Sequence, residues 1–202
     1  MKRKIIIVAI SFCFCIVSCE KKYCVKVIKD SPKTTILSKS EINTIKSLFD
    51  ANGVDYSNYL FSKINKPDEL GYQRVECYQF VNDLKVLSDY VVFRFRYGIL
   101  IFVSKNLAGT IDLDTKPLMN SNDVAKKFVD AMKQDQDCTN KDIRGCFDLE
   151  FGYYDLNAGG GYTTQNFIKA WKITPRKKEY PFAYINDSNS EIIYYFNGIF
   201  RD

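Results

Sequence analysis

The sequence predicts an α+β protein in which antiparallel sheets are each covered by a helix. Two segments carry apolar residues at helical spacing, and several others alternate apolar and polar residues as half-buried strands do. These segments occur in the order helix, strands, helix, strands. The aromatic content of 15% favours strands with one buried face. We therefore expect each helix to cover one face of its own sheet.

The first helix is expected to begin after Ser38. Ser38 and Glu41 stand in capping-box spacing, in which each side chain satisfies a backbone N–H at the start of a helix. One apolar stripe follows at helical spacing, formed by Ile42, Ile45, Leu48 and Phe49. Asn52-Gly53 is a typical C-terminal stop.

The first group of strands is expected from Tyr72 onward, after a turn at Lys66-Pro67-Asp68. The predicted strands are Tyr72–Phe80, Leu84–Tyr97, Ile99–Val103 and Gly109–Leu113. We expect them to form an antiparallel meander. Arg94 and Arg96 alternate with aromatic residues, which indicates packing on one face and charge on the other. This account is simpler than a nucleic-acid-binding sheet.

The second helix is expected to begin at Ser121, with Val124, Phe128, Val129 and Met132 on its apolar face. The strands predicted after it are Phe147–Leu156, Phe167–Thr174, Pro181–Asp187 and Ile192–Phe196. Trp171 alternates with polar neighbours and is predicted to be a core residue. Gly159-Gly160-Gly161 is predicted to be a hairpin loop, since a phosphate-binding loop would need a helix after it.

The N-terminal residues have the pattern of an export signal. Three basic residues, Lys2 to Lys4, precede an apolar run from Ile5 to Val17. That run is shorter than the ~20 residues that span a bilayer and fits the apolar region of a secretory signal. Ile16-Val17-Ser18-Cys19 resembles the lipobox of bacterial lipoprotein signals. The resemblance implies cleavage after Ser18 and lipidation of Cys19; an ordinary signal, or an uncleaved anchor, is the alternative.

Removal of residues 1–18 changes the charge and defines the expected organisation. It leaves 184 of the 202 residues and lowers the formal net charge from +5 to +2, because three basic residues are lost. The basic balance therefore gives no reason to expect a nucleic-acid partner. We expect a tether and lead-in at 19–37, which includes a short strand within 23–28. An N-terminal unit at 38–120 and a C-terminal unit at 121–202 are expected to follow.

Four cysteines remain after processing and lipidation: Cys24, Cys77, Cys138 and Cys146. An even number in an exported protein suggests disulfides, and four cysteines allow three connectivities. We favour Cys138–Cys146, whose short loop corresponds to roughly 2.5 kcal/mol of chain entropy. Cys24–Cys77 would then tie the N-terminal segment to the sheet. Four free thiols are the alternative.

The sequence offers little catalytic or metal-binding chemistry. It contains no histidine, which excludes histidine-activated nucleophiles, the HExxH metalloprotease motif and histidine-ligated metals. No Cys-x-x-Cys pair is present for zinc. The carboxylate pairs Asp148/Glu150 and Asp112/Asp114 are interpreted as solvated strand faces. We expect no catalytic residue, metal or cofactor, and we do not expect an enzyme.

The order of strands, turns and helix from Gly71 onward follows a known pattern. The segments that match its first part are Gln79–Val86, Tyr90–Tyr97, Ile99–Ser104 and Asn122–Val129. Those that match its second part are Ala170–Ile173, Ala183–Asp187 and Ser190–Ile193. They resemble the propeptides of thermolysin-like and fungalysin-like metalloproteases, followed by a small PepSY module. Asp83 and Ser190 replace glycines of that pattern, and the loop between Cys138 and Cys146 is an addition.

This resemblance implies a cystatin-like or PepSY-like fold and a binding role. Propeptides of this type chaperone and inhibit a protease, so a lipid-anchored copy is expected to act in trans on an envelope peptidase or another envelope protein. An exposed strand edge could provide the contact. The alternative is a structural or glycan-binding lipoprotein that uses exposed tyrosines. The expected location is the cell envelope, on the outer membrane or cell surface rather than the inner membrane.

Overall fold

The computed structural model describes residues 22–30, 36–88, 90–104, 107–138, 143–158 and 164–199. The expected signal peptide, Cys19 and the glycine loop at 159–161 lie outside these residues. The elements, in chain order, are β1 (Val25–Ile28), α1 (Lys39–Ala51), β2 (Tyr59–Ile64), β3 (Tyr72–Val81), β4 (Leu84–Val86), β5 (Val91–Arg96), β6 (Ile99–Val103), α2 (Ser121–Gln134), β7 (Phe147–Asp155), β8 (Phe167–Pro175), β9 (Phe182–Asn186) and β10 (Ile192–Phe196).

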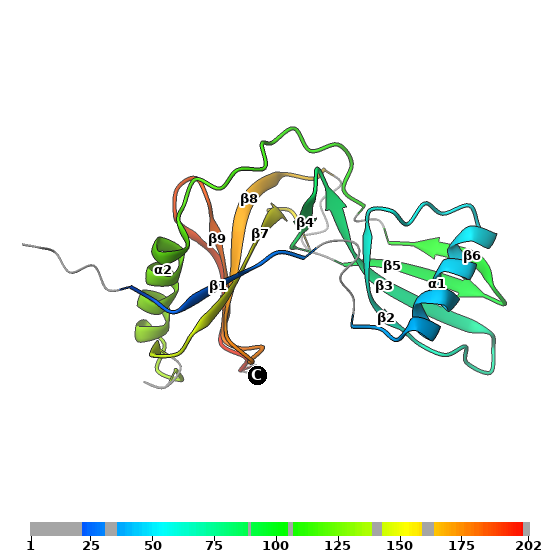
Figure 1. The fold of residues 1–202 in the computed structure, drawn as a ribbon, viewed down its shortest axis with the longest axis horizontal. Coiled ribbons are helices and arrows are strands. Elements are labelled where there is room, and N and C mark those ends of the chain that lie inside the picture. Colours follow the sequence, from blue (N-terminus) through cyan, green and yellow to red (C-terminus); the bar gives the residue numbers. More distant parts are fainter. Residues whose placement is uncertain are drawn as a thin grey trace, which may run out of the picture.

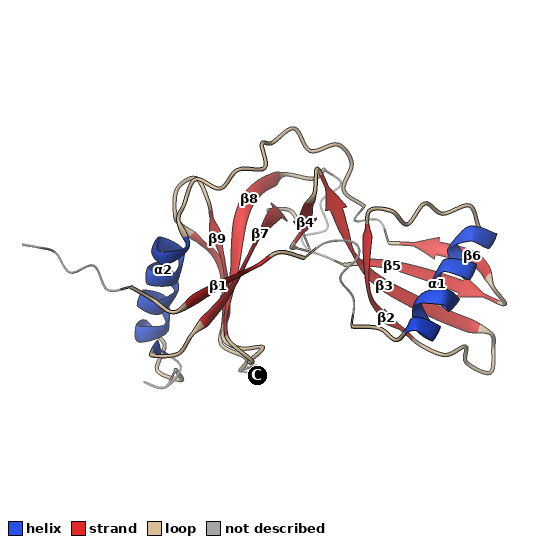
Figure 2. Ribbon diagram, in the orientation of Figure 1, coloured by secondary structure: helices blue, strands red, loops and turns tan. Residues whose placement is uncertain are grey.

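The strands form one mixed ten-stranded sheet, which confirms the α+β class (Figure 2). Their order is β10-β9-β8-β7-β4-β3-β5-β6, with β1 added to β7 and β2 added to β3. The prediction of purely antiparallel sheets was wrong, because β7 runs parallel to both β1 and β4. Parallel neighbours need long crossover connections. Here those connections are the segments that carry α1, α2 and most of the other strands.

The molecule has two lobes, joined where β4 lies between β3 and β7 (Figure 1). The N-terminal lobe comprises α1, β2, β3, β5 and β6. Its capping box is present: Ser38 N donates to Glu41 Oε2 at 2.8 Å, and Glu41 N donates to Ser38 Oγ. The helix buries its apolar stripe against the strands. The buried residues of this core are Ile45, Phe49, Phe61, Val75, Cys77, Val91, Phe93 and Phe95.

The C-terminal lobe comprises β1, α2 and β7 to β10. Asn120 caps α2, because its side chain accepts hydrogen bonds from the amides of Asn122 and Asp123. The predicted apolar face of α2 packs on the sheet, and Trp171 belongs to the same core, as predicted. The buried residues are Val124, Ala125, Phe128, Val129, Met132, Phe147, Leu149, Trp171, Ile173, Ala183 and Ile185.

Three strand predictions differ from the structure. β2 was not predicted, and it pairs with β3 through a register shift. The predicted long strand Leu84–Tyr97 is two strands, because β4 pairs with β7 whereas β5 returns to β3. Gly109–Leu113 forms no strand; Ile111 is instead buried against Val86 and Tyr153. Apolar alternation therefore marked burial correctly but could not identify the pairing partner.

The segment that leads into α2 is held to the C-terminal lobe by one buried carboxylate. Asp187, only 1% exposed, accepts hydrogen bonds from the amides of Leu118 and Met119. It also accepts one from Trp171 Nε1 at 2.9 Å. A buried carboxylate needs such partners. Three donors from two separate segments therefore fix the start of α2 against β8 and β9.

Candidate functional site

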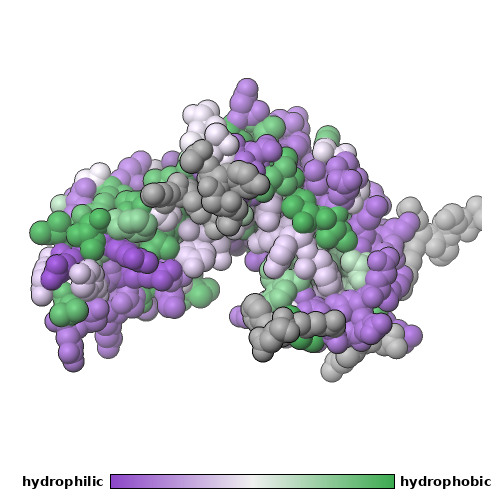
Figure 3. All heavy atoms as spheres, turned by 180° about the vertical axis from the view of Figure 1, so that it is seen from behind, coloured by the Kyte–Doolittle hydropathy of each residue, from purple (hydrophilic) through white to green (hydrophobic). Residues whose placement is uncertain are grey.

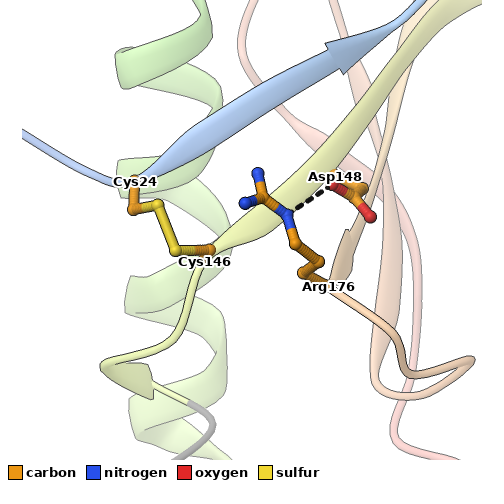
Figure 4. Close-up of a disulfide and its surroundings, with 4 residues drawn as sticks. All are labelled: Cys24, Cys146, Asp148 and Arg176. Carbon is orange, nitrogen blue, oxygen red and sulfur yellow. Dashed lines mark hydrogen bonds and ion pairs between the residues drawn. A yellow bond between two sulfur atoms is a disulfide. The ribbon is translucent and has the colours of Figure 1, made fainter.

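A disulfide ties the first strand to the middle of the C-terminal lobe (Figure 4). Cys24 is bonded to Cys146, with 4.6 Å between their Cα atoms. The favoured pairings Cys138–Cys146 and Cys24–Cys77 were therefore wrong. The reason is the parallel register of β1 and β7, which pairs Val25 with Phe147 and so places the two preceding cysteines side by side.

The other two cysteines keep their thiols. Cys77 lies in the core of the N-terminal lobe, where its Sγ donates to the carbonyl of Val91 and burial raises its pKa. Cys138 follows α2, and its Sγ lies 3.2 Å from Tyr195 Oη.

The C-terminal sheet has one face covered by α2 and one face without a helix. Leu149, Ile173 and Ala183 are cross-strand neighbours on the covered face. Their sequence neighbours Glu150, Lys172 and Tyr184 are paired in the same way, so they lie on the opposite face. We call this opposite face the open face. Figure 1 shows α2 on the outer side of its lobe, so the open face is turned toward the hollow between the lobes that is visible in Figure 3.

Aromatic rings cover much of the open face. They belong to Tyr154, Tyr180, Phe182, Tyr184, Tyr194 and Phe196. Phe182 is central, with its ring centre 5.7 to 5.9 Å from those of Tyr180, Tyr184, Tyr194 and Phe196. Tyr180 and Tyr194 are more than 40% exposed. Exposed apolar surface of this kind on a sheet commonly marks an interaction site.

A groove of about 400 Å³ borders these rings. Its lining includes Asp148, Glu150, Lys172, Thr174, Tyr180 and Phe182. Pockets that bind small ligands start at roughly 300 Å³ and combine apolar walls with a few polar groups. The groove meets both conditions, and we take it as the candidate functional site.

The inner end of the groove meets a cluster of charged side chains at the junction of the lobes. Lys85 Nζ lies 2.6 Å from Glu150 Oε1 and 3.1 Å from Asp30 Oδ2. The same ammonium lies 4.0 Å from the centre of the Tyr78 ring. Glu150 is only 13% exposed at its side chain. The interpretation of Asp148/Glu150 as a solvated pair was therefore wrong for Glu150, since β4 brings Lys85 over it.

Burial controls the protonation of this cluster. It raises the pKa of Glu150, although Lys85 lies beside that carboxyl. Burial acts in the same direction on Asp30, but hydrogen bonds with Glu150 and Lys85 and the charge of Lys85 outweigh it, so the pKa of Asp30 is lowered. Burial disfavours the Lys85 ammonium, yet the two carboxyls reverse that effect and raise its pKa.

Lys172 lies opposite Glu150 on the neighbouring strand, but that carboxylate is engaged by Lys85. Asp148 accepts a hydrogen bond from Arg176 Nε at 3.0 Å, and Glu150 is paired with Lys85. Among the described residues, the Lys172 ammonium makes no hydrogen bond or ion pair. It lies 5.7 Å from the centre of the Phe182 ring. Burial lowers its pKa; the charge of Glu150, its cross-strand neighbour, opposes this shift without reversing it, and the charge of Lys85 adds to it.

The remaining sequence predictions have mixed outcomes. Arg94 and Arg96 are exposed and alternate with buried residues, as expected. Asp114 forms an ion pair with Lys169 rather than a shared site with Asp112. Within the described residues, no cluster of three metal-binding side chains is present, and no helix is long and apolar enough to cross a bilayer. The groove was missed because its residues come from separate strands with no common motif.

No protein-family model matches this chain, and no curated protein matches its sequence at a significant level.

Proposed function

We propose that this protein is a lipid-anchored, non-catalytic binding module of a bacterial cell envelope. The observation that carries the binding role is the groove on the open face, where aromatic rings lie beside a partly buried lysine that forms no hydrogen bond or ion pair with a described residue. The chemistry of its lining suits recognition of a polar ligand. The disulfide supports an extracytoplasmic location, since such bonds persist mainly in oxidising compartments.

The proposed anchor would hold the C-terminal lobe close to the membrane. Only four residues separate Cys19 from Cys24, and Cys24 is bonded to Cys146. A fully extended chain of this length spans at most roughly 18 Å. Two or three acyl chains on Cys19 would make the anchoring stable. The groove, which lies in the same lobe, would then be presented near the membrane surface.

Metabolic labelling with a clickable fatty acid tests the anchor. We expect the full chain, expressed in a bacterial host, to carry the label and Cys19→Ala to lose it. Cys15→Ala is the matched control and should stay labelled, because that residue leaves with the signal peptide. An unlabelled wild-type chain, or a labelled Cys19→Ala variant, would contradict the proposed anchor.

An envelope peptidase or another envelope protein is a second candidate ligand. Exposed apolar residues of the edge strand β6, Ile99 and Ile101, favour a protein contact. However, Asn52 occupies part of that edge: its side chain accepts from Leu100 N at 2.8 Å and donates to the Gly98 carbonyl. Inhibition assays with peptidases from the native envelope test this candidate, which fails if none is inhibited or captured.

A cystatin-like or PepSY-like fold is also part of this proposal. It is supported by the packing of one helix on each group of strands. The parallel pairs of β7 count against a close match.

A further inference from the structure

We propose that the groove on the open face binds an acidic saccharide, with Lys172 pairing with a sugar carboxylate and the rings of Phe182 and Tyr180 stacking on the sugar. The inference rests on the proposed binding role and names the ligand class. Three features of the groove support it. They are the incompletely neutralised ammonium of Lys172, the aromatic rings beside it, and the pairing of the floor strand β8 with a strand on each side.

The partly buried charges of the groove favour an anionic ligand group, whereas Lys178 and Glu179, which also line it, are exposed to solvent. Its two strand carboxylates already have basic partners: Asp148 accepts from Arg176, and Glu150 is paired with Lys85. Lys172 forms no hydrogen bond or ion pair with a described residue; the charges of Glu150 and Asp30 act on it, but both carboxylates are paired with Lys85. A partly buried ammonium that shares its nearest carboxylates with a second lysine is incompletely neutralised. A ligand carboxylate at this point would satisfy it through a charge-assisted hydrogen bond.

The aromatic rings beside Lys172 favour a sugar as the molecule that carries the anionic group. Phe182 lies beside the Lys172 ammonium, and the Tyr180 ring lies 5.9 Å from that of Phe182, centre to centre. A pyranose has an apolar face of C–H groups that packs on such rings and a rim of hydroxyls. Thr174 and Asp148, which also line the groove, can bond those hydroxyls. An inorganic anion would leave the rings unused.

The backbone argues against an extended peptide in this groove. β8 forms the floor, and it is paired with β7 on one side and β9 on the other. The backbone groups of Ala170–Ile173, which include the position of Lys172, are therefore used within the sheet. Peptides that bind as an added strand need a free edge. The ligand must be recognised by side chains, as a saccharide is.

Calorimetry with the mature full chain in detergent tests the inference. The probe is trigalacturonic acid, and its trimethyl ester is the matched ligand, because esterification removes the charges and keeps the rings. We expect binding of the acid and affinity for the ester at least about tenfold weaker, in line with one charge-assisted hydrogen bond. No binding of the acid at millimolar concentration would overturn the proposal, as would equal affinity for the ester.

Variants locate the binding. Lys172→Met keeps the stem of the side chain and should weaken acid binding about tenfold, whereas Lys172→Arg should retain it. Phe182→Leu should weaken binding of both acid and ester. Lys126→Met, on the exposed side of α2, is the control and should bind as the wild type does. If circular dichroism shows that Lys172→Met is misfolded, the binding results for Phe182→Leu and Lys172→Arg decide whether the groove binds the saccharide.

Three further outcomes distinguish failure of this inference from failure of the proposed function. Tri-glutamate that binds as tightly as trigalacturonic acid would show that the groove selects charge alone, and the saccharide assignment would fall. Loss of the fatty-acid label would overturn the anchor while leaving saccharide binding measurable. A labelled protein that binds no acidic saccharide would overturn the ligand class alone.

Discussion

The two lobes are built from similar elements but are stabilised in different ways. The N-terminal lobe depends on apolar packing: the Phe49 ring lies 4.6 to 6.1 Å, centre to centre, from those of Tyr56, Phe61, Phe93 and Phe95. The C-terminal lobe adds a disulfide and the buried carboxylate of Asp187, and its Glu150 is paired with Lys85 at the junction of the lobes. The specific long-range links are thus concentrated in the lobe that carries the groove.

This difference follows from the path of the chain. β1 belongs to the C-terminal lobe, so the whole N-terminal lobe is inserted between β1 and α2. The Cys24–Cys146 bond spans 122 residues and closes that insertion. A lobe assembled from two distant parts of the chain must hold them together against the entropy of the intervening loop. A lobe made of consecutive elements has no such requirement.

The largest expected effect comes from removing the disulfide. Cys24→Ser with Cys146→Ser should lower the free energy of unfolding by about 4–5 kcal/mol, because a loop of more than about 100 residues is released. Urea denaturation measures it, and β1 should lose its protection from hydrogen exchange first. Cys138→Ser, which keeps the bridge, is the control. A double variant as stable as the wild type would refute the role assigned to the bond.

The core of the N-terminal lobe is tested by Phe49→Ala. Phe49 is fully buried, so its truncation should cost about 4 kcal/mol through lost burial and a residual cavity. Hydrogen exchange should accelerate in β3 and β5 and change little in β8 and β9. Asn43→Ala, at an exposed position of the same helix, should change stability by less than about 0.5 kcal/mol. Equal acceleration in both lobes would mean that they unfold as one unit.

The smallest effect compares the two helix caps. Ser38→Ala and Asn120→Ala should each cost about 1 kcal/mol, because each removes a side-chain acceptor for the first amides of a helix. Urea denaturation gives the cost, and exchange of the first-turn amides locates it. The Asn120 variant should leave α1 unaffected, and the Ser38 variant should leave α2 unaffected. Spread of either effect to the other helix would argue against separate stabilisation.

Local features of the fold could be predicted from the sequence. The capping box at Ser38, the apolar face of α2, the core position of Trp171 and the alternation around Arg94 all follow from neighbours within a few residues. Side-chain spacing along a helix or strand is fixed by the backbone, so a short segment contains the whole signal.

The candidate site could not be predicted in this way. Glu150 is indistinguishable from a surface carboxylate until β4 brings Lys85 to it, and Lys172 resembles any strand lysine until its neighbours are known. The pairing of β1 with β7, and with it the disulfide, depends on register between segments more than 100 residues apart.

The sequence by itself determined the α+β class, the two helices with their caps and most strands, and it predicts a lipid anchor at Cys19. These depend on composition and on spacing within single segments. Only the tertiary structure decided the mixed sheet, the Cys24–Cys146 bond, and the groove where Lys172 meets Phe182. The physical reason is that strand pairing is chosen by the packing of the whole chain, and a strand's own residues specify its faces but not its neighbours.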